Sequence, residues 1–176
     1  MIKLVAKELR TTTPKKKDLS KIKRREIYLV LDDVLDTYNV GGIFRLSDAI
    51  SAKKVILCGR TETPPNTRIK KASINTTEWV AWEYHENTLS AIEKLRKEVP
   101  NIQIIAVEQD EKSVPYTEID YKLPLALIVG NETTGLSNKV LEKCDFVAEI
   151  PMFGVNTSLN VIISLAVVAF EAIERE

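Results

Sequence analysis

Along residues 26–176, short apolar runs alternate with stretches in which apolar residues recur every three to four positions. Runs such as 26–31 (EIYLVL) are apolar without interruption, which is typical of strands buried on both faces of a parallel sheet. Strands are predicted at 26–31, 54–58, 77–84, 102–109, 125–130 and 146–150. Helices are predicted at 39–50, 66–72, 87–99, 136–144 and 158–173, with Asn39 and Asn87 as N-caps. This alternation predicts an α/β fold with a mostly parallel sheet and flanking helices.

The charge is distributed unevenly along a chain whose formal net charge is zero. Residues 1–25 carry ten Lys/Arg against Glu8 and Asp18, a net charge of +8, which leaves −8 for residues 26–176. With 176 residues, 44% of them hydrophobic, one domain with a sizeable core is expected. We therefore divide the chain into a basic N-terminal arm, 1–25, and one domain, 26–176. The arm is predicted to bind an anionic partner, and the alternative is a tail that only aids solubility.

Cysteine and histidine usage gives no sign of a metal site. Cys58 and Cys144 form no CxxC pattern, and the single histidine, His85, has no obvious partner. A reduced, cytoplasmic setting fits two unpaired cysteines. The N-terminus lacks the apolar segment of a signal peptide. The longest apolar stretch, 159–170, is shorter than the roughly 20 residues that span a bilayer, so it is predicted to be a buried helix and no membrane partner is expected.

Three segments follow predicted strands and carry polar residues where a plain connection needs none: 35–49, 129–137 and 150–161. In an open parallel sheet, ligands bind beyond the carboxyl ends of the strands. Gly130 and Gly135 have the spacing of a phosphate-binding loop, but Leu136 and Ser137 replace its Lys-Ser/Thr pair, which disfavours a nucleotide hydrolase. The sequence contains neither GxGxxG nor GxSxG. Glycine loops with few charges suit an adenosine without a triphosphate, although the glycines could also serve only as turns.

Taken together, the three segments resemble the three motifs of the SpoU/TrmH branch of the SPOUT RNA methyltransferases, over residues 27–174. The Asn, Gly and Arg of the first motif correspond to Asn39, Gly41 and Arg45. The Gly-x-Glu and Gly-Leu-Ser of the second correspond to Gly130, Glu132, Gly135 and Leu136. The Ile-Pro-Met and Ser-Leu-Asn of the third correspond to residues 150–152 and 158–160.

This resemblance implies a C-terminal trefoil knot, S-adenosylmethionine as methyl donor, and transfer to the ribose 2′-hydroxyl of RNA. It implies four catalytic residues: Arg45, Asn39, Glu132 and Asn160. It implies that the cofactor is held by Val129, Gly130, Asn131, Gly135, Ile150, Met152, Ser158 and Leu159. The favoured substrate is tRNA, with rRNA as an alternative, and the rival function is a noncatalytic RNA-binding protein with the same fold. No metal is implied.

Physical chemistry limits the roles of these residues. Arginine stays protonated at ordinary pH, so Arg45 is better suited to clamping a phosphate than to acting as a base. Asn39 is predicted either to orient Arg45 or the ribose, or to cap its helix, and Ser158 is a further candidate N-cap. Trp79, Trp82 and Tyr84 could stack on a base or pack in the core. The last helix is apolar nearly all round, which, together with the resemblance, predicts a homodimer.

Overall fold

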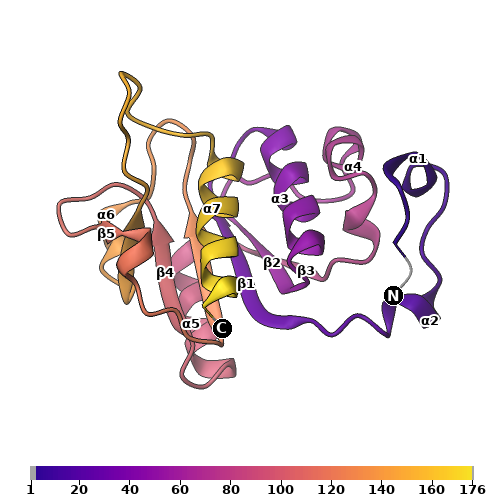
Figure 1. Ribbon diagram of the computed structural model, residues 1–176, viewed down its shortest axis with the longest axis horizontal. Coiled ribbons are helices and arrows are strands. Elements are labelled where there is room, and N and C mark those ends of the chain that lie inside the picture. The colour runs from indigo at the N-terminus through magenta and orange to yellow at the C-terminus, as the bar shows by residue number, and fades with distance from the viewer. Residues whose placement is uncertain (1–2, 176) are drawn as a thin grey trace.

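The predicted alternation of strands and helices is confirmed by a computed structural model, which describes residues 3–175 (Figure 1). Seven strands form one sheet in which every pairing between neighbours is parallel. In chain order the strands are β1 (Arg25–Asp32), β2 (Ala52–Cys58), β3 (Trp82–His85), β4 (Gln103–Val107), β5 (Val114–Pro115), β6 (Leu125–Val129) and β7 (Phe146–Glu149). The spatial order is β3-β2-β1-β6-β4-β7-β5. The apolar runs are most continuous in β1, β6 and β4. These three strands lie at the centre of the sheet, as expected where both faces are covered.

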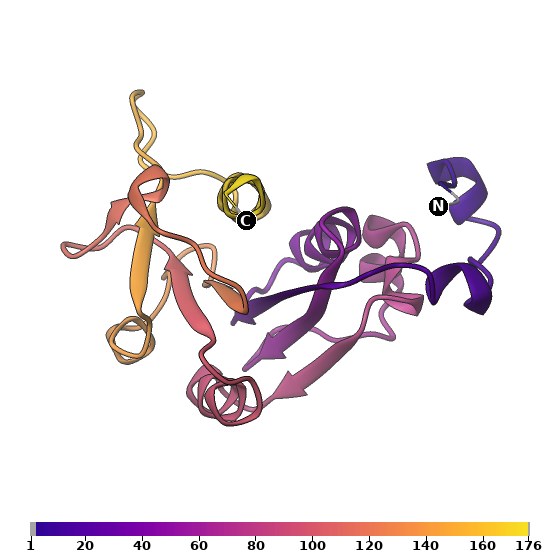
Figure 2. The same ribbon diagram turned by 60° about the horizontal axis from the view of Figure 1, so that its bottom comes forward.

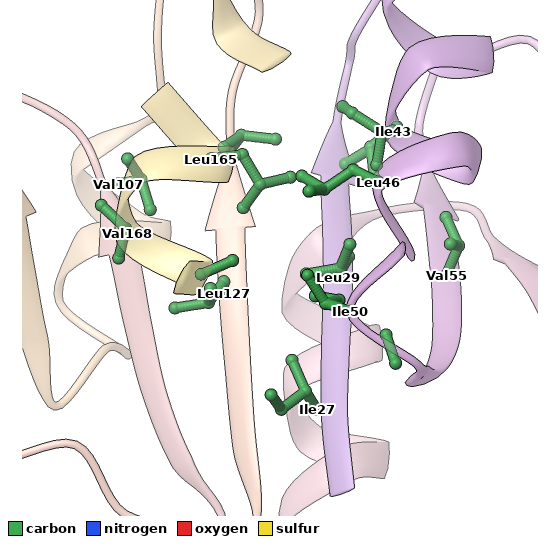
Figure 3. Close-up of a cluster of buried hydrophobic side chains, with 14 of the residues drawn as sticks. Ile27, Leu29, Ile43, Leu46, Ile50, Val55, Val107, Leu127, Leu165 and Val168 are labelled. Carbon is green, nitrogen blue, oxygen red and sulfur yellow. The ribbon is translucent and has the colours of Figure 1, made fainter. Parts of the chain in front are cut away.

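Helices cover both faces of the sheet (Figure 2). The helices are α3 (Thr37–Ala49), α4 (Thr67–Ser73) and α7 (Val161–Glu174) on one face, and α5 (Thr88–Glu98) and α6 (Asn138–Leu141) on the other. Alternate strand residues point to opposite faces. In β1, Leu29 packs in the core beneath α3 and α7, and Val30 packs in the core against α5 and α6. Figure 3 shows the first of these cores, where Leu46 of α3 and Leu165 of α7 approach the strands.

Several element boundaries differ from the prediction. Helix α3 starts at Thr37, and its N-cap is Asp36, whose carboxylate accepts the Tyr38 N–H at 2.8 Å. Asn39 is therefore not a cap but a buried residue in the first turn. The last helix begins at Val161 and is capped by Asn160, not Ser158.

The predicted strand at 77–84 is wrong in its first half. Thr76–Glu78 form a 3₁₀ helix, η1, and only β3 from Trp82 is extended and paired. The reason is a turn that the apolar pattern does not reveal: Ile74 and Asn75 both have positive φ, which reverses the chain after α4. Short elements were also missed, namely β5 and the 3₁₀ helix η2 (Tyr116–Glu118).

The chain returns from the β7 side of the sheet to α7, which packs against α3, β6 and β4. The exposed segment 151–160 makes this crossing (Figure 1). The predicted trefoil knot would be formed by this crossing and stays a prediction. Within residues 3–175, no helix has the length and apolar character needed to cross a membrane.

The basic arm contains two single-turn helices, α1 (Ala6–Leu9) and α2 (Lys16–Leu19). It lies beside α4, at the end of the molecule away from β7 (Figures 1 and 2). The Asn75 side-chain amide donates to the Leu9 carbonyl at 2.6 Å, and Arg24 donates to the Trp79 carbonyl at 3.5 Å. These contacts attach the arm to the domain at η1.

Candidate active site

A cavity of about 370 Å³ opens beyond the carboxyl ends of β4, β6 and β7. Its wall is formed by the loop after β6, the segment after β7 and the first turn of α7. All eight predicted cofactor residues line it: Val129, Gly130, Asn131, Gly135, Ile150, Met152, Ser158 and Leu159. Two predicted catalytic residues, Glu132 and Asn160, line it as well. The fold thus brings the second and third motifs together around one space, as expected at the carboxyl edge of a parallel sheet.

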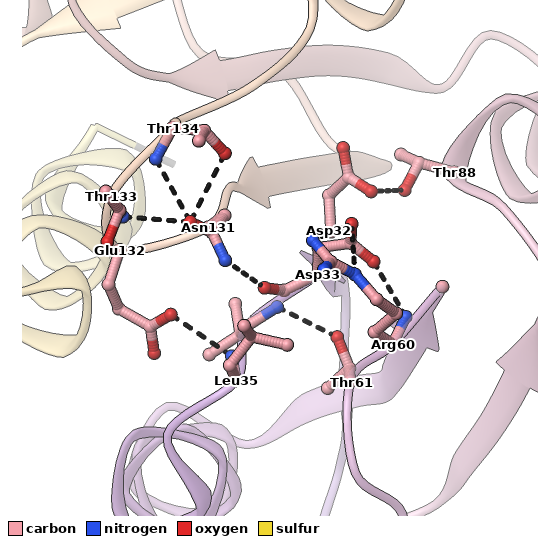
Figure 4. A network of polar contacts seen from close by, with 12 residues as sticks. Asp32, Asp33, Leu35, Arg60, Thr61, Thr88, Asn131, Glu132, Thr133 and Thr134 are labelled. Carbon is pink, nitrogen blue, oxygen red and sulfur yellow. Dashed lines mark hydrogen bonds and ion pairs between the residues drawn. The ribbon is translucent and has the colours of Figure 1, made fainter.

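The loop after β6 is a tight, internally bonded turn. The Gly135 N–H donates to the Asn131 carbonyl at 2.9 Å, and the Asn131 side-chain oxygen accepts the N–H groups of Thr133 and Thr134 at 2.9 and 3.0 Å (Figure 4). A Cβ on Gly130 would lie 2.6 Å from the Gly135 carbonyl carbon, so the two ends of the loop approach too closely for a side chain. Gly135 has φ +63° and faces the Glu108 carboxylate. Both glycines are therefore required by the loop, which resolves why they occur at this spacing.

The Glu132 carboxylate joins this loop to the start of α3. It accepts the Asn39 side-chain amide at 2.9 Å, the Asp36 N–H at 3.0 Å and the Leu35 N–H at 3.1 Å (Figure 4 shows the Leu35 contact). Partial burial acts to raise the pKa of Glu132, but the hydrogen bonds from Asn39 and from backbone N–H groups outweigh it and lower the pKa below its ordinary value. Glu132 is therefore ionised at neutral pH.

Asn39 connects the first motif to the third. Its side-chain oxygen accepts the Asn160 amide at 3.0 Å, while its own amide donates to Glu132. Since Asn39 is only 6% exposed, both of its polar atoms are satisfied within the protein. The Asn160 side-chain oxygen in turn caps α7 by accepting the Ile162 N–H at 2.9 Å. Three predicted catalytic residues thus form one continuous chain, Glu132–Asn39–Asn160.

Arg45 lies apart from this chain. It is exposed on α3, does not line the cavity, and makes no hydrogen bond or ion pair with any residue in the described range 3–175. Tyr38, seven positions earlier and 55% exposed, shares its helix face. The fourth predicted catalytic residue is therefore not brought to the cavity of its own chain.

Glu108 and Gln109 are among the cavity residues that the sequence analysis missed. The Glu108 carboxylate, just past β4, accepts the Leu136 N–H at 3.0 Å and the Gln109 N–H at 2.9 Å. The Gln109 side chain donates to the Thr157 carbonyl at 2.8 Å and so fastens the segment after β7. The predicted strand 102–109 included both residues, whereas β4 ends at Val107, so they lie just past the strand at the edge where ligands bind.

A second polar network supports the cavity from the β1 side. The Asn131 amide donates to the Asp33 carbonyl at 2.9 Å, and Arg60 makes a two-pronged contact with the Asp33 carboxylate at 3.0 and 3.2 Å (Figure 4). The Arg60 backbone N–H and, to a smaller extent, its guanidinium lower the pKa of Asp33, although partial burial of the carboxylate acts to raise it. The loops after β1, β2 and β6 are thereby connected.

A family model described as the SpoU rRNA methylase family matches residues 26–170. The chain belongs to this family. The match includes all three motif segments and the Glu132–Asn39–Asn160 chain that they form.

Relatives and solved structures agree with this assignment. A protein of Bacillus subtilis named for the TrmH family of tRNA/rRNA methyltransferases is 28% identical over 148 residues, and one from Staphylococcus saprophyticus is 32% identical over 147. Each alignment covers 84% of this chain and 58% of the relative, so the chain spans well under two thirds of their length.

Among solved structures, an A. aeolicus TrmH/SpoU tRNA-modifying enzyme has a TM-score of 0.79 at 25% identity and covers 97% of this chain and 81% of its own. An AdoMet-bound rRNA methyltransferase from Sinorhizobium meliloti has a TM-score of 0.79 at 31% identity, over 94% of this chain and 59% of its own. The α/β fold with its parallel sheet is therefore that of the SPOUT methyltransferases.

Proposed function

We propose that the protein is a cytoplasmic RNA methyltransferase that transfers a methyl group from S-adenosylmethionine to a ribose 2′-hydroxyl, with tRNA as its favoured substrate. The observation that carries this proposal is the cavity in which the second and third motifs meet, joined by the Glu132–Asn39–Asn160 chain to the first. Relatives named for both tRNA and rRNA support RNA as the substrate class.

The cavity residues fit an adenosine-containing ligand without phosphates. A volume near 370 Å³ lies at the lower end of the range for small-molecule sites, about 300–1,000 Å³. The two glycines leave backbone groups open to a flat ligand, and Ile150, Met152 and Leu159 supply apolar surface. No lysine or arginine is among the described lining residues, as expected for a ligand that carries no phosphate.

S-adenosylmethionine, when bound, supplies a methyl group already activated on a sulfonium, so the protein's task is alignment and removal of the hydroxyl proton. Glu132 is ionised and accepts hydrogen bonds from the start of α3, and Asn39 links it to Asn160. We assign these three residues the positioning of the cofactor pocket against the target ribose. Arg45 would clamp the phosphate beside that ribose through its planar fork.

Arg45 can take this role only if it reaches a cavity, and the candidate is the cavity of a second copy of the chain. Tyr38 beside Arg45, and Ile163 and Phe170 on α7, are 55%, 52% and 48% exposed. Ile163 and Phe170 share one face of α7 by their seven-residue spacing, and α7 packs against α3. We propose that these faces pair in a homodimer, so that Arg45 of one copy meets the cavity of the other.

The test is methyl transfer from radiolabelled S-adenosylmethionine to unmodified tRNA and, in parallel, rRNA, followed by nucleoside analysis. We expect label in 2′-O-methylnucleosides of tRNA. Label on a base would refute the 2′-O assignment, and label in rRNA alone would refute the tRNA assignment. Calorimetry showing no binding of S-adenosylmethionine would leave the noncatalytic RNA-binding alternative. Light scattering in the micromolar range tests the dimer, and a monomer would refute it.

A further inference from the structure

A second cavity, of about 700 Å³, lies between the basic arm and the domain. Its apolar walls come from both: Leu4, Leu9, Leu19 and Ile22 on the arm, and Ala49 and Trp79 on the domain. We call it the arm groove. It lies at the α1–α2 end of the molecule, away from β4 and β7, where the candidate active site opens (Figures 1 and 2). It is therefore separate from the cofactor cavity.

Trp79 forms a fixed aromatic wall of the arm groove. Its indole N–H donates to the Asp48 carboxylate at 2.7 Å, and its carbonyl accepts from Arg24. The ring also packs against the main core, so its orientation is set before any ligand arrives. A fixed aromatic face is the usual platform for an unstacked nucleic-acid base.

Around the arm groove the acidic side chains already have partners, whereas the lysines are open to a ligand. The acidic ones are already engaged: Glu8 accepts the Val5 N–H at 2.9 Å, Asp18 pairs with Lys21 at 3.4 Å, and Asp48 holds Trp79. The basic ones, Lys3, Lys15 and Lys17, are exposed and form no ion pair with a carboxylate in the described part of the chain. The rim therefore offers positive charge beside an apolar, aromatic interior.

We propose that the arm groove binds an unpaired nucleotide of the RNA substrate, with the base against Trp79 and the neighbouring phosphates at Lys3, Lys15 and Lys17. This inference rests on the proposed function only in taking RNA as the substrate. A stacking surface beside free cations is the combination that single-stranded nucleic acids use. An apolar face of a second copy fits less well, because it would cover three lysines without supplying anions. The arm groove thus holds the RNA at a distance from the methylated ribose and sets its register.

The first experiment uses the full chain carrying Trp82→Phe, which leaves Trp79 as the single tryptophan reporter. Titration with hexauridylate should quench Trp79 fluorescence, whereas tripolyphosphate should not. Lys15→Gln with Lys17→Gln should weaken binding about 10- to 30-fold at 0.1 M salt, and should reduce the slope of log affinity against log salt by about 1.4. The matched control, Lys139→Gln with Lys143→Gln in and just after α6, should leave the affinity and the salt slope unchanged.

A second variant tests the base contact. Trp79→Leu, measured by anisotropy of labelled hexauridylate, should lose about 5- to 100-fold in affinity while keeping its salt slope. If circular dichroism shows that Trp79→Leu does not fold, the lysine variants and the quenching experiment still test whether the arm groove binds RNA. Absence of quenching, equal quenching by tripolyphosphate, or equal effects of the α6 control would overturn the proposal. So would dissociation of an oligomer by the groove variants with RNA affinity unchanged, which would make the groove a protein interface.

Donor-binding calorimetry on the same preparations separates this inference from the proposed function. Methyl-donor binding and RNA methylation without quenching of Trp79 would refute only the proposal that the arm groove binds RNA. Quenching by hexauridylate without methyl-donor binding would refute the methyltransferase proposal and support RNA binding in the arm groove.

Discussion

The bond between Asn39 and Glu132 joins two motifs that lie 93 positions apart, and its energy can be measured by a double-mutant cycle. The variants are Asn39→Ala, Glu132→Gln and both together. Asn39→Ala removes the amide that donates to Glu132 and the oxygen that accepts from Asn160. Glu132→Gln keeps the shape of the side chain but replaces one acceptor oxygen with a donor, which then faces an N–H of Leu35, Asp36 or Asn39.

The structure sets the size of the expected effects. Asn39 is 6% exposed, so losing its two hydrogen bonds should cost about 1–3 kcal/mol of unfolding free energy. Glu132 is more accessible to water, which can replace a lost partner, so about 1–2 kcal/mol is expected for Glu132→Gln. Because the two side chains share one bond, the double variant should lose less than the sum, by about 0.5–2 kcal/mol. For a chain of this length, each kcal/mol lowers Tm by about 2–4 °C.

Urea unfolding followed by circular dichroism, at one fixed protein concentration, gives the four free energies. Glu142→Gln on the exposed surface near α6 is the control and should change stability by less than about 0.5 kcal/mol. Additivity of the two changes within about 0.3 kcal/mol would refute the coupling. In that case the Glu132–Asn39–Asn160 chain would be a set of independent contacts.

Three further predictions concern the mechanism, the cofactor loop and the edge of the sheet. Arg45→Lys should lose most of the single-turnover methylation rate, on the order of 100-fold, because it keeps the charge but not the planar fork; methyl-donor binding should persist, and a wild-type rate would refute the clamp. Gly130→Ala should abolish donor binding by calorimetry, because the new Cβ would meet the Gly135 backbone at 2.6 Å; unchanged affinity would show that the loop can shift. Burial acts to raise the pKa of Glu83, but Lys54, His85 and Lys94 outweigh it and lower the pKa to about 2. That carboxylate therefore contributes stability above its ordinary pKa, which is lost as pH falls towards 2, and the Tm difference between wild type and Glu83→Gln should shrink over that range.

The alternation of elements could be predicted from the sequence because burial on both faces leaves a local trace. A central strand such as β6 (Leu125–Val129) has no polar residue, since helices cover both of its sides. A cap can be equally local: Asn87 accepts the Ser90 N–H three residues ahead, so its type and position allowed it to be predicted. The eight predicted cofactor residues came from the family resemblance, and they line one cavity because strand ends in a parallel sheet converge on one edge.

What the sequence could not decide depended on contacts between distant residues. Asn39 is a residue type that often caps helices, but Asp36 occupies the N-cap position. Asn39 is instead buried and links Glu132 to Asn160 by hydrogen bonds. Arg45 belongs to the same motif, yet the helix turns it to a different face, away from its own cavity. The arm groove also depends on contacts between distant residues, such as that of the Asn75 amide with the Leu9 carbonyl 66 positions away. Hydrophobic periodicity records whether a side chain is buried, whereas its partner is set by how the chain is folded in three dimensions.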